Sequence, residues 1–299
     1  MDTRFILSCE STVDLPYSYV HSRGIPVIEY TYTMDGVEYS DDMGRDPGAM
    51  ARFYEKLAAG VMARTSQISA YRYREFLEPL LKQGDVLHIA FGTGMTQSVN
   101  NAYLAAEELR EEYPDRRLVI VDSLCSSSGY GLLVDSAADL RDEGKSLDEV
   151  EAWVMAHRQL VHHQFFSTDL THYRRSGRIS GPAATLGAIL NICPIMRLDD
   201  LGRIYAYDKV RGKKRAIQTT VDRMERHAVG GKDYADKCFI CNSNCRETAE
   251  QTRAAVEARF PNIAGKVRIC DIGTIIAGHC GPGTVAVFFY GDAREPQKG

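Results

Sequence analysis

Three arginines gather in the stretch RRSGRIS at residues 174–180, although the chain as a whole carries a net charge of −4. An apolar segment with many small residues, GPAATLGAILNICPI, follows it directly. Guanidinium groups recognise carboxylates and phosphates, and small residues on an apolar helix permit close packing or leave room for a slender apolar ligand. Two interpretations are open: a solvated charge run beside a core helix, or a cationic rim beside a lipid-like slot.

Four clusters of hydroxyl side chains could also hold an anion: SCESTVD (8–14), ARTSQIS (63–69), GTGMTQS (92–98) and DSLCSSSGYG (122–131). Hydroxyls and the amides at helix N-termini together make a neutral, donor-rich pocket suited to a carboxylate or a phosphate. The alternative is that these residues only cap helices. Residues 92–97 lack the third glycine of a dinucleotide fingerprint, and GxxxxGK[ST] does not occur, so we expect no nucleotide cofactor. GxSxG does not occur either, which weakens the interpretation as a serine hydrolase.

Histidines and cysteines add one further candidate. His279, within GHCGPGT, is predicted to lie in a loop, where it could donate to an anion near neutral pH. The pair His162 and His163 opens a predicted strand and is interpreted as structural. The cluster Cys238, Cys241 and Cys245 offers three ligands where a structural zinc or iron–sulfur site generally needs four. We therefore expect free thiols and no metal site.

Composition excludes other functions. With 299 residues, 44% hydrophobic and 25% charged, the chain is typical of a globular protein of one large or two ordinary domains. The mildly acidic balance argues against nucleic-acid binding. Because the start, MDTRFILSCEST, has no long apolar run and no later run approaches a membrane span, a cytoplasmic location is expected.

The first 160 residues alternate strand and helix patterns, which predicts a parallel sheet. Because ligands bind at the carboxyl edge of such a sheet, the hydroxyl clusters are expected to meet there. A capping box, Ser146 with Glu149, predicts a helix over 146–160. The other predicted elements are strands 5–8, 25–33, 86–91 and 118–122, and helices 47–59, 71–82, 98–112 and 127–142.

After residue 160 strands follow one another more directly, which indicates a mixed sheet. The predicted strands are 162–168, 194–198, 203–210, 238–242, 266–273 and 284–291, and the predicted helices are 182–192, 212–228 and 246–259. We therefore predict an α/β protein of two closely packed domains, 1–160 and 161–299, with a parallel sheet in the first and a mixed sheet in the second.

Six motifs in order resemble the DegV family of bacterial fatty-acid-binding proteins over nearly the whole chain. They are SCESTVDLP (8–16), RTSQIS (64–69), HIAFGTGMTQSVNNAYLAAEEL (88–109), VDSLCSSSGYG (121–131), the series RRSGRIS…LGAILNICPI…LGRI…KVRGKK, and GHCGPG (278–283). Departures from the family pattern affect the head-group region. Glu10 stands for aspartate, Gly92 and Thr93 for two serines, Thr96 for serine, Gln97 for glycine and Cys193 for lysine.

The resemblance implies a two-domain DegV fold that encloses one long-chain fatty acid, with the carboxylate at the domain junction and the tail in the second domain. It implies the following site residues: Thr65, Ser66, Thr93, Thr96 and His279 for the carboxylate, Arg178 and Arg211 at a rim for phosphate or a partner, and Ala183, Leu186, Gly187 and Leu190 for the tail.

The resemblance further implies a lipid-presenting subunit without catalysis of its own. A fatty acid kinase would be its partner, and would make an acyl phosphate for phospholipid synthesis. Such a role is compatible with peripheral or transient membrane contact. Two other functions stay open: a hydrolase or phosphotransferase that uses the hydroxyl loops and Arg178, and a sensor of small anions.

Overall fold

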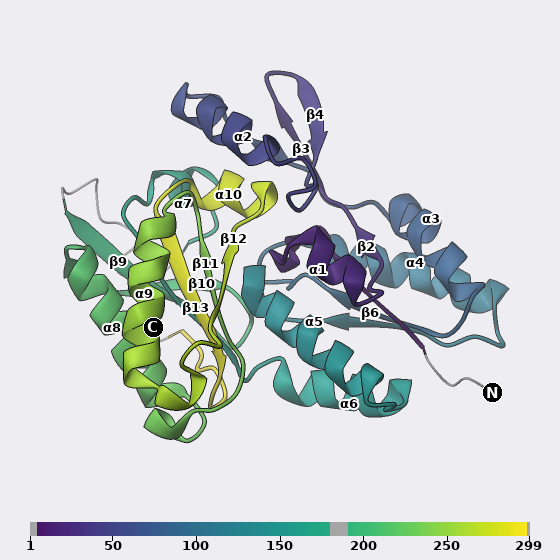
Figure 1. Ribbon diagram of the computed structural model, residues 1–299. Helices are drawn as coiled ribbons and strands as arrows, with labels where there is room; N and C mark the ends of the chain where they lie inside the picture. The colour runs from purple at the N-terminus through teal and green to yellow at the C-terminus, as the bar shows by residue number, and fades with distance from the viewer. Residues whose placement is uncertain (1–4, 180–190, 298–299) are drawn as a thin grey trace.

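The first sheet is parallel, as predicted. The computed structural model describes residues 5–179 and 191–297. The sheet has the order β2-β1-β6-β7, and helices α3 and α4 pack on one face while α5 and α6 pack on the other (Figure 1). The bounds are β1 Ile6–Glu10, β2 Val27–Ile28, β6 Val86–Ala90, β7 Leu118–Asp122, α1 Tyr17–Ser22, α3 Ala70–Leu81, α4 Ser98–Glu112, α5 Ser127–Asp142 and α6 Leu147–His157. The predicted capping box of α6 is present.

The second sheet is mixed, which confirms the other half of the predicted fold class. Its order is β10-β9-β8-β13-β11-β12, with β11 and β12 parallel and the other neighbours antiparallel. Helices α8 and α9 cover one face (Figure 1). Helix α5 lies between the two large sheets and contacts strands of both. The bounds are β8 Val161–Ser167, β9 Ile192–Leu198, β10 Ile204–Arg211, β11 Cys238–Asn242, β12 Arg268–Asp271, β13 Thr284–Tyr290, α8 Lys213–His227 and α9 Arg246–Arg259.

A third, antiparallel sheet of order β4-β3-β5 was not predicted. It projects with α2 beyond the two larger sheets (Figure 1). The single strand predicted over 25–33 is therefore wrong: pairing with β1 ends at Ile28, because the next amides turn away and Tyr30 N donates to Ser11 Oγ at 3.2 Å. The bounds are β3 Thr31–Met34, β4 Val37–Ser40, β5 Arg64–Thr65 and α2 Ala49–Ala58.

Because the strand predicted over 25–33 divides in two, one hydroxyl cluster lies in a different sheet from the one expected. Residues 63–69 include β5, which pairs antiparallel with β3. This cluster therefore lies in the small sheet, whereas the clusters after β1, β6 and β7 follow parallel strands as expected. The site combines residues from two sheet edges rather than from one.

His279 lies in helix α10, Thr274–Cys280, and not in the predicted loop. The helix starts because the Asp41 carboxylate, distant in sequence, accepts hydrogen bonds from Thr274 N and Oγ1 at 3.1 and 2.9 Å. It ends at Gly281, whose φ of +65° suits glycine. The remaining short elements are α7 Thr171–Arg175 and the 3₁₀ turns η1 Ser11–Val13, η2 Gly231–Asp233 and η3 Pro261–Ile263.

The helix predicted over 182–192 lies outside the described residues except for its last two positions. Those two positions correct its end. Asn191 has a φ of +67° and Ile192 begins β9, paired with Arg211. The chain is therefore already extended two residues before Pro194, because the pairing with β10 reaches this far.

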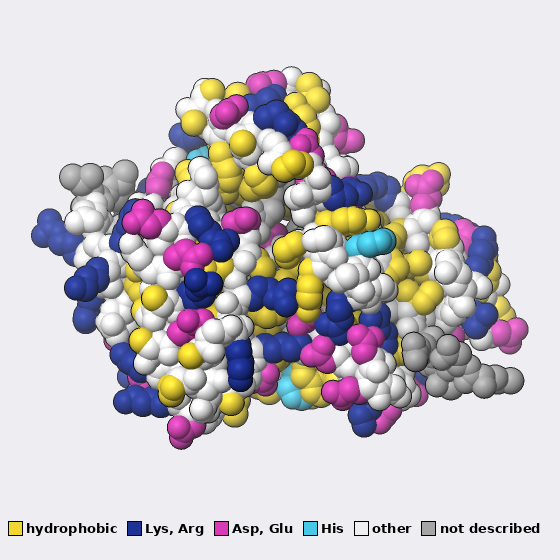
Figure 2. Space-filling view, viewed as in Figure 1, with side chains coloured by type: hydrophobic (Ala, Val, Ile, Leu, Met, Phe, Trp, Pro, Cys, Tyr) yellow, Lys and Arg dark blue, Asp and Glu magenta, His cyan; other side chains and the backbone are white. Residues whose placement is uncertain are grey.

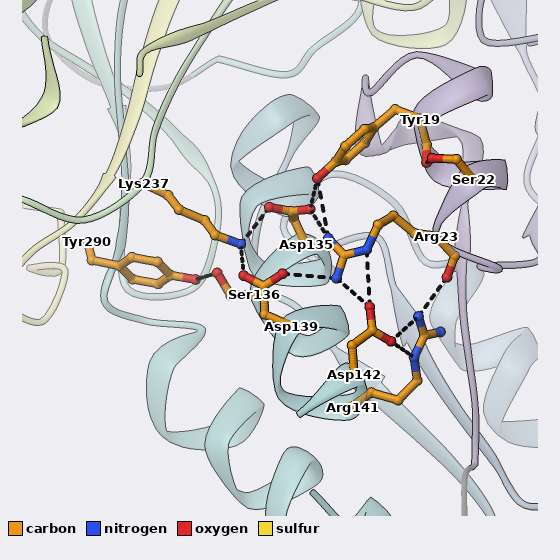
Figure 3. Close-up of polar contacts among 10 residues, drawn as sticks. All are labelled: Tyr19, Ser22, Arg23, Asp135, Ser136, Asp139, Arg141, Asp142, Lys237 and Tyr290. Carbon is orange, nitrogen blue, oxygen red and sulfur yellow. Dashed lines mark hydrogen bonds and ion pairs between the residues drawn. The ribbon is translucent and has the colours of Figure 1, made fainter. Parts of the chain in front are cut away.

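A charged cluster joins the two halves of the molecule (Figure 3). Lys237, just before β11, donates to Asp135 of α5 at 2.6 Å and also contacts Asp139. Arg23 reaches Asp135, Asp139 and Asp142 from the other side, at 2.9–3.0 Å. Because Asp135 is almost fully buried, this network holds α5 against the C-terminal half more firmly than a surface ion pair would.

The described residues form no continuous basic patch on the face shown in Figure 2. In Figure 2 basic and acidic side chains are interspersed over the face shown. Within residues 5–179 and 191–297, no helix is both long and apolar enough to cross a membrane.

Candidate functional site

A cavity of about 210 Å³ lies between the six-stranded sheet and the loops of the N-terminal half. Its walls are mainly apolar. The sheet contributes Phe165, Leu198, Ile204, Ala286 and Phe288, and the N-terminal half contributes Tyr30, Phe91 and Met95. The segment around α10 adds Ile272, Ile275 and Ile276. An elongated apolar group would find hydrocarbon contacts along these walls.

Polar groups gather at one part of this cavity. Thr65 Oγ1 and His279 Nε2 lie 3.0 Å apart, and the other ring nitrogen of His279, Nδ1, is buried without a hydrogen-bond partner among the described residues. Such a group loses its solvation without compensation. Ser66, Thr96 and Arg178 line the same cavity. Together these side chains offer hydroxyl, imidazole and guanidinium groups to an anion.

The His279 imidazole is neutral at pH 7. Burial, aided by the nearby Arg178 guanidinium, lowers the pKa of His279 from 6.5 to about 4. The hydrogen bond between Thr65 Oγ1 and His279 Nε2 can run in either direction, and if Thr65 is the donor the proton of the neutral ring resides on Nδ1. The ring then offers one N–H, and an anionic ligand would raise its pKa by favouring the charged form.

Arg178 connects the two sides of the cavity. Its Nε donates to Met95 O at 3.1 Å and its Nη1 to Ser176 O at 2.8 Å. Met95 belongs to the hydroxyl cluster after β6, and Ser176 follows α7. The guanidinium therefore stands at the junction of the halves with further N–H groups available to a ligand.

Two of the predicted site residues do not line the cavity. Thr93 directs its hydroxyl to Asp122 Oδ2 at 2.6 Å and its amide to Asp122 Oδ1 at 3.1 Å. Arg211 is exposed at the end of β10. The predicted tail residues Ala183, Leu186, Gly187 and Leu190 lie outside the described residues. Of the predicted set, the structure thus brings together Thr65, Ser66, Thr96, Arg178 and His279.

Sequence reasoning missed the role of Glu10. This carboxylate is fully buried and accepts hydrogen bonds from Tyr30 OH at 3.0 Å, Tyr73 OH at 2.6 Å and Phe91 N at 3.1 Å. His88 Nε2 lies 3.5 Å from it. Through Tyr30 and Phe91, Glu10 fixes one wall of the cavity. No local signal shows this, because the groups around the carboxylate come from three separate segments, at residues 30, 73 and 88–91.

The N-terminus of α5 forms a second polar region of the cavity, and its groups are paired. Ser126 N donates to His163 Nε2 at 3.0 Å, and Ser127 donates to the buried Asp14, which also accepts from Gly273 N at 2.9 Å. Burial raises the pKa of Asp14 and lowers that of His163. This region is consistent with a structural role in joining α5 to the second sheet.

Thiols also reach the cavity. None of the eight cysteines forms a disulfide bond, and Cys241 and Cys280 are among the lining residues. Cys238 and Cys241 belong to β11, where their strand partners are Phe289 and Ala286 of β13. The first two cysteines of the cluster are therefore part of the buried sheet. The arrangement as a whole can bind an apolar chain that ends in one anionic group.

Comparisons with known proteins identify the family of the chain. The model of the DegV family matches residues 6–292. A DegV domain-containing protein of Clostridium perfringens (strain 13 / Type A) is 35% identical over 294 residues, which cover 98% of this chain and 99% of that protein. A second such protein, from Streptococcus pyogenes serotype M3, is 32% identical over 96% of this chain and 98% of its own length.

Solved structures share the fold. A DegV family protein from Thermus thermophilus, described for its fatty acid binding, is 26% identical with a TM-score of 0.84, and the match covers 96% of this chain and 99% of that one. The fatty acid kinase B3 protein of Streptococcus pneumoniae, loaded with linoleic acid, gives a TM-score of 0.82 at 19% identity, over 96% and 99% of the two chains. At that identity the second likeness concerns the fold.

Proposed function

Since this chain belongs to the DegV family, we propose that it binds one long-chain fatty acid, with the carboxylate beside Thr65, His279 and Arg178 and the tail along the apolar walls. The observation that carries the proposal is a mainly apolar cavity in which Thr65, Ser66, Thr96, Arg178 and His279 come together. His279 Nδ1 is buried there without a partner among the described residues. A carboxylate oxygen would satisfy that atom.

The proposed head-group chemistry needs donors rather than a full counter-charge. Neutral His279 gives one N–H, Thr96 and Ser66 can give hydroxyls, and Arg178 gives a guanidinium N–H. A buried carboxylate without such donors would be heavily penalised. The donors therefore fix the orientation of the head group, while the affinity comes from elsewhere.

The tail would supply that affinity. About 15 methylenes at about 0.8 kcal/mol each correspond to an upper limit of about 12 kcal/mol, from which the ordering costs of binding are subtracted. In the proposed division at residue 160, the tail lies mostly against the second domain. Phe165, Leu198, Ile204, Ala286 and Phe288 all belong to that part of the chain.

The proposal extends to a reaction in which this protein is the presenting subunit, in the cytoplasm. In the partner, a fatty acid kinase, a carboxylate oxygen would attack the γ-phosphorus of ATP. The bond to the β–γ bridging oxygen would break, giving acyl phosphate and ADP. Arg178 at the junction would face the carboxylate. Arg211, exposed at the end of β10, is assigned to the partner or to the phosphoryl group.

Mass spectrometry of the purified protein with its ligand tests the binding step. We expect native spectra to show one acyl chain per protein, and solvent extraction to identify it as a free fatty acid. If no acyl chain co-purifies, and delipidated protein takes up no oleate, the proposal is wrong.

A coupled assay with fatty acid kinase and ATP tests the presentation step. Arg178→Ala should abolish acyl phosphate formation or oleate binding, whereas Arg116→Ala, in the exposed turn before β7, should change neither. If Arg178→Ala leaves both intact, Arg178 has no part in the junction. Turnover of acyl esters or ATP by the isolated protein would instead favour an enzyme.

A further inference from the structure

A second group of ligand-type side chains lies away from the cavity, on the other face of the six-stranded sheet. His162 and His163 are neighbours on β8, so their side chains point to opposite faces. His163 faces the cavity, and His162 stacks on His227 at the end of α8. Asp292, just after β13, completes the group.

We propose that His162, His227 and Asp292 bind a divalent transition-metal ion of the Zn²⁺ type. Within the described residues, these three form the one group of at least three His, Cys, Asp or Glu side chains whose ligand atoms lie within 4.8 Å of one another. Two imidazoles and a carboxylate, with water in the fourth position, are a known zinc ligand set. Imidazole nitrogen favours zinc over magnesium or calcium.

The three ligand atoms already converge. His162 Nε2 lies 2.9 Å from Asp292 Oδ1, and His227 Nδ1 lies 3.1 Å from the same oxygen. His162 Nε2 also donates to the Asp292 carbonyl at 2.9 Å, so a metal ion would take the place of that proton. His162 is held between two rings, with centroid distances of 4.9 Å to His227 and 5.1 Å to Phe289. The two imidazoles are stacked at an interplanar angle of 24°, so a turn of the His227 ring is needed to bring the in-plane lone pairs of both nitrogens onto one ion.

The backbone supports the same geometry. Asp292 N donates to His227 O at 3.0 Å, which ties the carboxylate to the end of α8. Gly291 makes this approach feasible, since a Cβ at this position would lie 2.3 Å from His227 O and 2.8 Å from the His162 ring. The carbonyl end of the 15-residue helix α8 also favours a cation.

The group contains one negative charge for a cation, the carboxylate of Asp292. Three arginines nearby form their bonds to groups outside this cluster: Arg197 donates to the carbonyls of Glu295 and Pro296, Arg223 lies 4.0 Å from Asp208, and Arg294 donates to the carbonyls of Leu124 and Val161. The neighbouring cavity, of about 240 Å³, is also lined by Glu295.

Hydrogen bonds to Asp292 satisfy both histidines without metal, so the chain does not need the ion to fold. Metal binding should therefore add stability to a protein that is already folded. The expectation from sequence that no metal site exists considered the cysteines and interpreted His162 as structural. That interpretation overlooked residues 227 and 292, which only the fold brings to His162.

Zinc titration of chelator-stripped protein tests the proposal. We expect one Zn²⁺ per chain and a Tm increase of about 4 °C at a concentration a hundredfold above Kd. Asp292→Asn and His227→Gln should weaken binding by more than about tenfold. The Asp292 side chain is 62% exposed, so Asp292→Asn should fold normally. His157→Gln, which alters a histidine stacked on Trp153, is the matched control and should bind as the parent does.

Cobalt spectroscopy separates this site from the thiols. Co²⁺ bound at the proposed site should show d–d bands without a thiolate charge-transfer band, and Cys245→Ser should not change them. A thiolate band that disappears in Cys245→Ser would assign the ion to cysteine and overturn the proposal. Unchanged zinc affinity in Asp292→Asn, or no stoichiometric zinc in the parent protein, would also overturn it. Fatty-acid binding is measured separately and decides none of these outcomes.

Discussion

Two buried polar clusters beside the cavity differ in whether their hydrogen bonds are complete. The Glu10 carboxylate accepts from two tyrosine hydroxyls and the Phe91 amide. His279 lines the same cavity. Its Nε2 is hydrogen-bonded to Thr65, and its Nδ1 has no partner among the described residues. Both clusters contain residues that a reader of the sequence would consider for chemistry.

The difference separates architecture from ligand binding. A complete network stabilises the fold and has no group left for a ligand, whereas an incomplete one carries a desolvation cost that a ligand can remove. Glu10 therefore holds the cavity wall, and His279 is the better candidate for ligand contact. Substitutions at Glu10 should therefore lower mainly the free energy of unfolding, whereas substitutions at His279 should lower mainly the affinity for the fatty acid.

Removing the complete cluster should have the largest effect. Glu10→Leu leaves at least three buried donors without an acceptor, and we expect the free energy of unfolding to fall by about 3–5 kcal/mol. Urea denaturation measures this. Glu112→Gln, which alters an exposed carboxylate paired with Arg74, is the control and should cost less than about 1 kcal/mol. A loss below that value in Glu10→Leu would mean that the network is not structural.

Removing the incomplete cluster should affect binding more than stability. His279→Ala should weaken oleate binding by about 10–100-fold, the value of a hydrogen bond to a charged group of about 1.5–3 kcal/mol. Its unfolding free energy should change by less than about 1 kcal/mol, because one ring nitrogen has no described partner to lose. Titration calorimetry on delipidated protein measures the affinity. His21→Ala, on the exposed face of α1, should bind as the parent does; equal affinities in all three would remove His279 from the site.

Acid should destabilise the ligand-free protein through His279. The unfolded chain takes up this proton below pH 6.5 and the folded chain only below about pH 4, so stability is complete above pH 6.5 and declines as pH falls through this window. The expected loss at pH 5 is about 2 kcal/mol. Histidines 162 and 163 act in the same direction. The contribution of His279 is therefore the part that His279→Gln removes in urea unfolding at pH 7 and pH 5; an unchanged pH dependence would contradict it.

Two threonines of one loop provide the finest comparison. Thr96 lines the cavity, whereas Thr93 is bonded to Asp122. Thr96→Val should weaken oleate binding by about 3–10-fold and leave stability nearly unchanged. Thr93→Val should lower the unfolding free energy by about 1 kcal/mol and leave affinity unchanged. The reverse pattern would show that Thr93 contacts the head group, as the family resemblance implied.

The periodicity of apolar residues and the helix caps were sufficient to predict most of the fold. Alternating patterns predicted both large sheets and most helices, since a buried parallel strand such as Val86–Ala90 and a capping box such as Ser146 with Glu149 depend on local residues. The elements that sequence reasoning missed depend on distant partners. Helix α10 starts at the Asp41 carboxylate, and the strand predicted over 25–33 divides where Tyr30 turns towards Ser11 and Glu10.

Sequence motifs predicted only those residues of the candidate site that belong to a motif. Thr65, Ser66, Thr96, Arg178 and His279 line one cavity, although they come from segments more than 200 residues apart at the extremes. Thr93 does not line this cavity, because its hydroxyl donates to the carboxylate of Asp122; its predicted role at the head group stays a prediction. The group of His162, His227 and Asp292 has no motif at all, since its members meet only after the sheet and α8 have packed.

The thiols in the cavity wall have a consequence for the proposed cargo. An acyl phosphate is a mixed anhydride, and a thiolate beside it would capture the acyl group as a thioester. Burial raises the pKa of Cys280 to about 12 and that of Cys241 well above its ordinary value, so both sulfurs remain protonated and weakly nucleophilic. The burial that makes the cavity apolar therefore also keeps the thiols in its wall unreactive towards an acyl phosphate formed from the bound fatty acid.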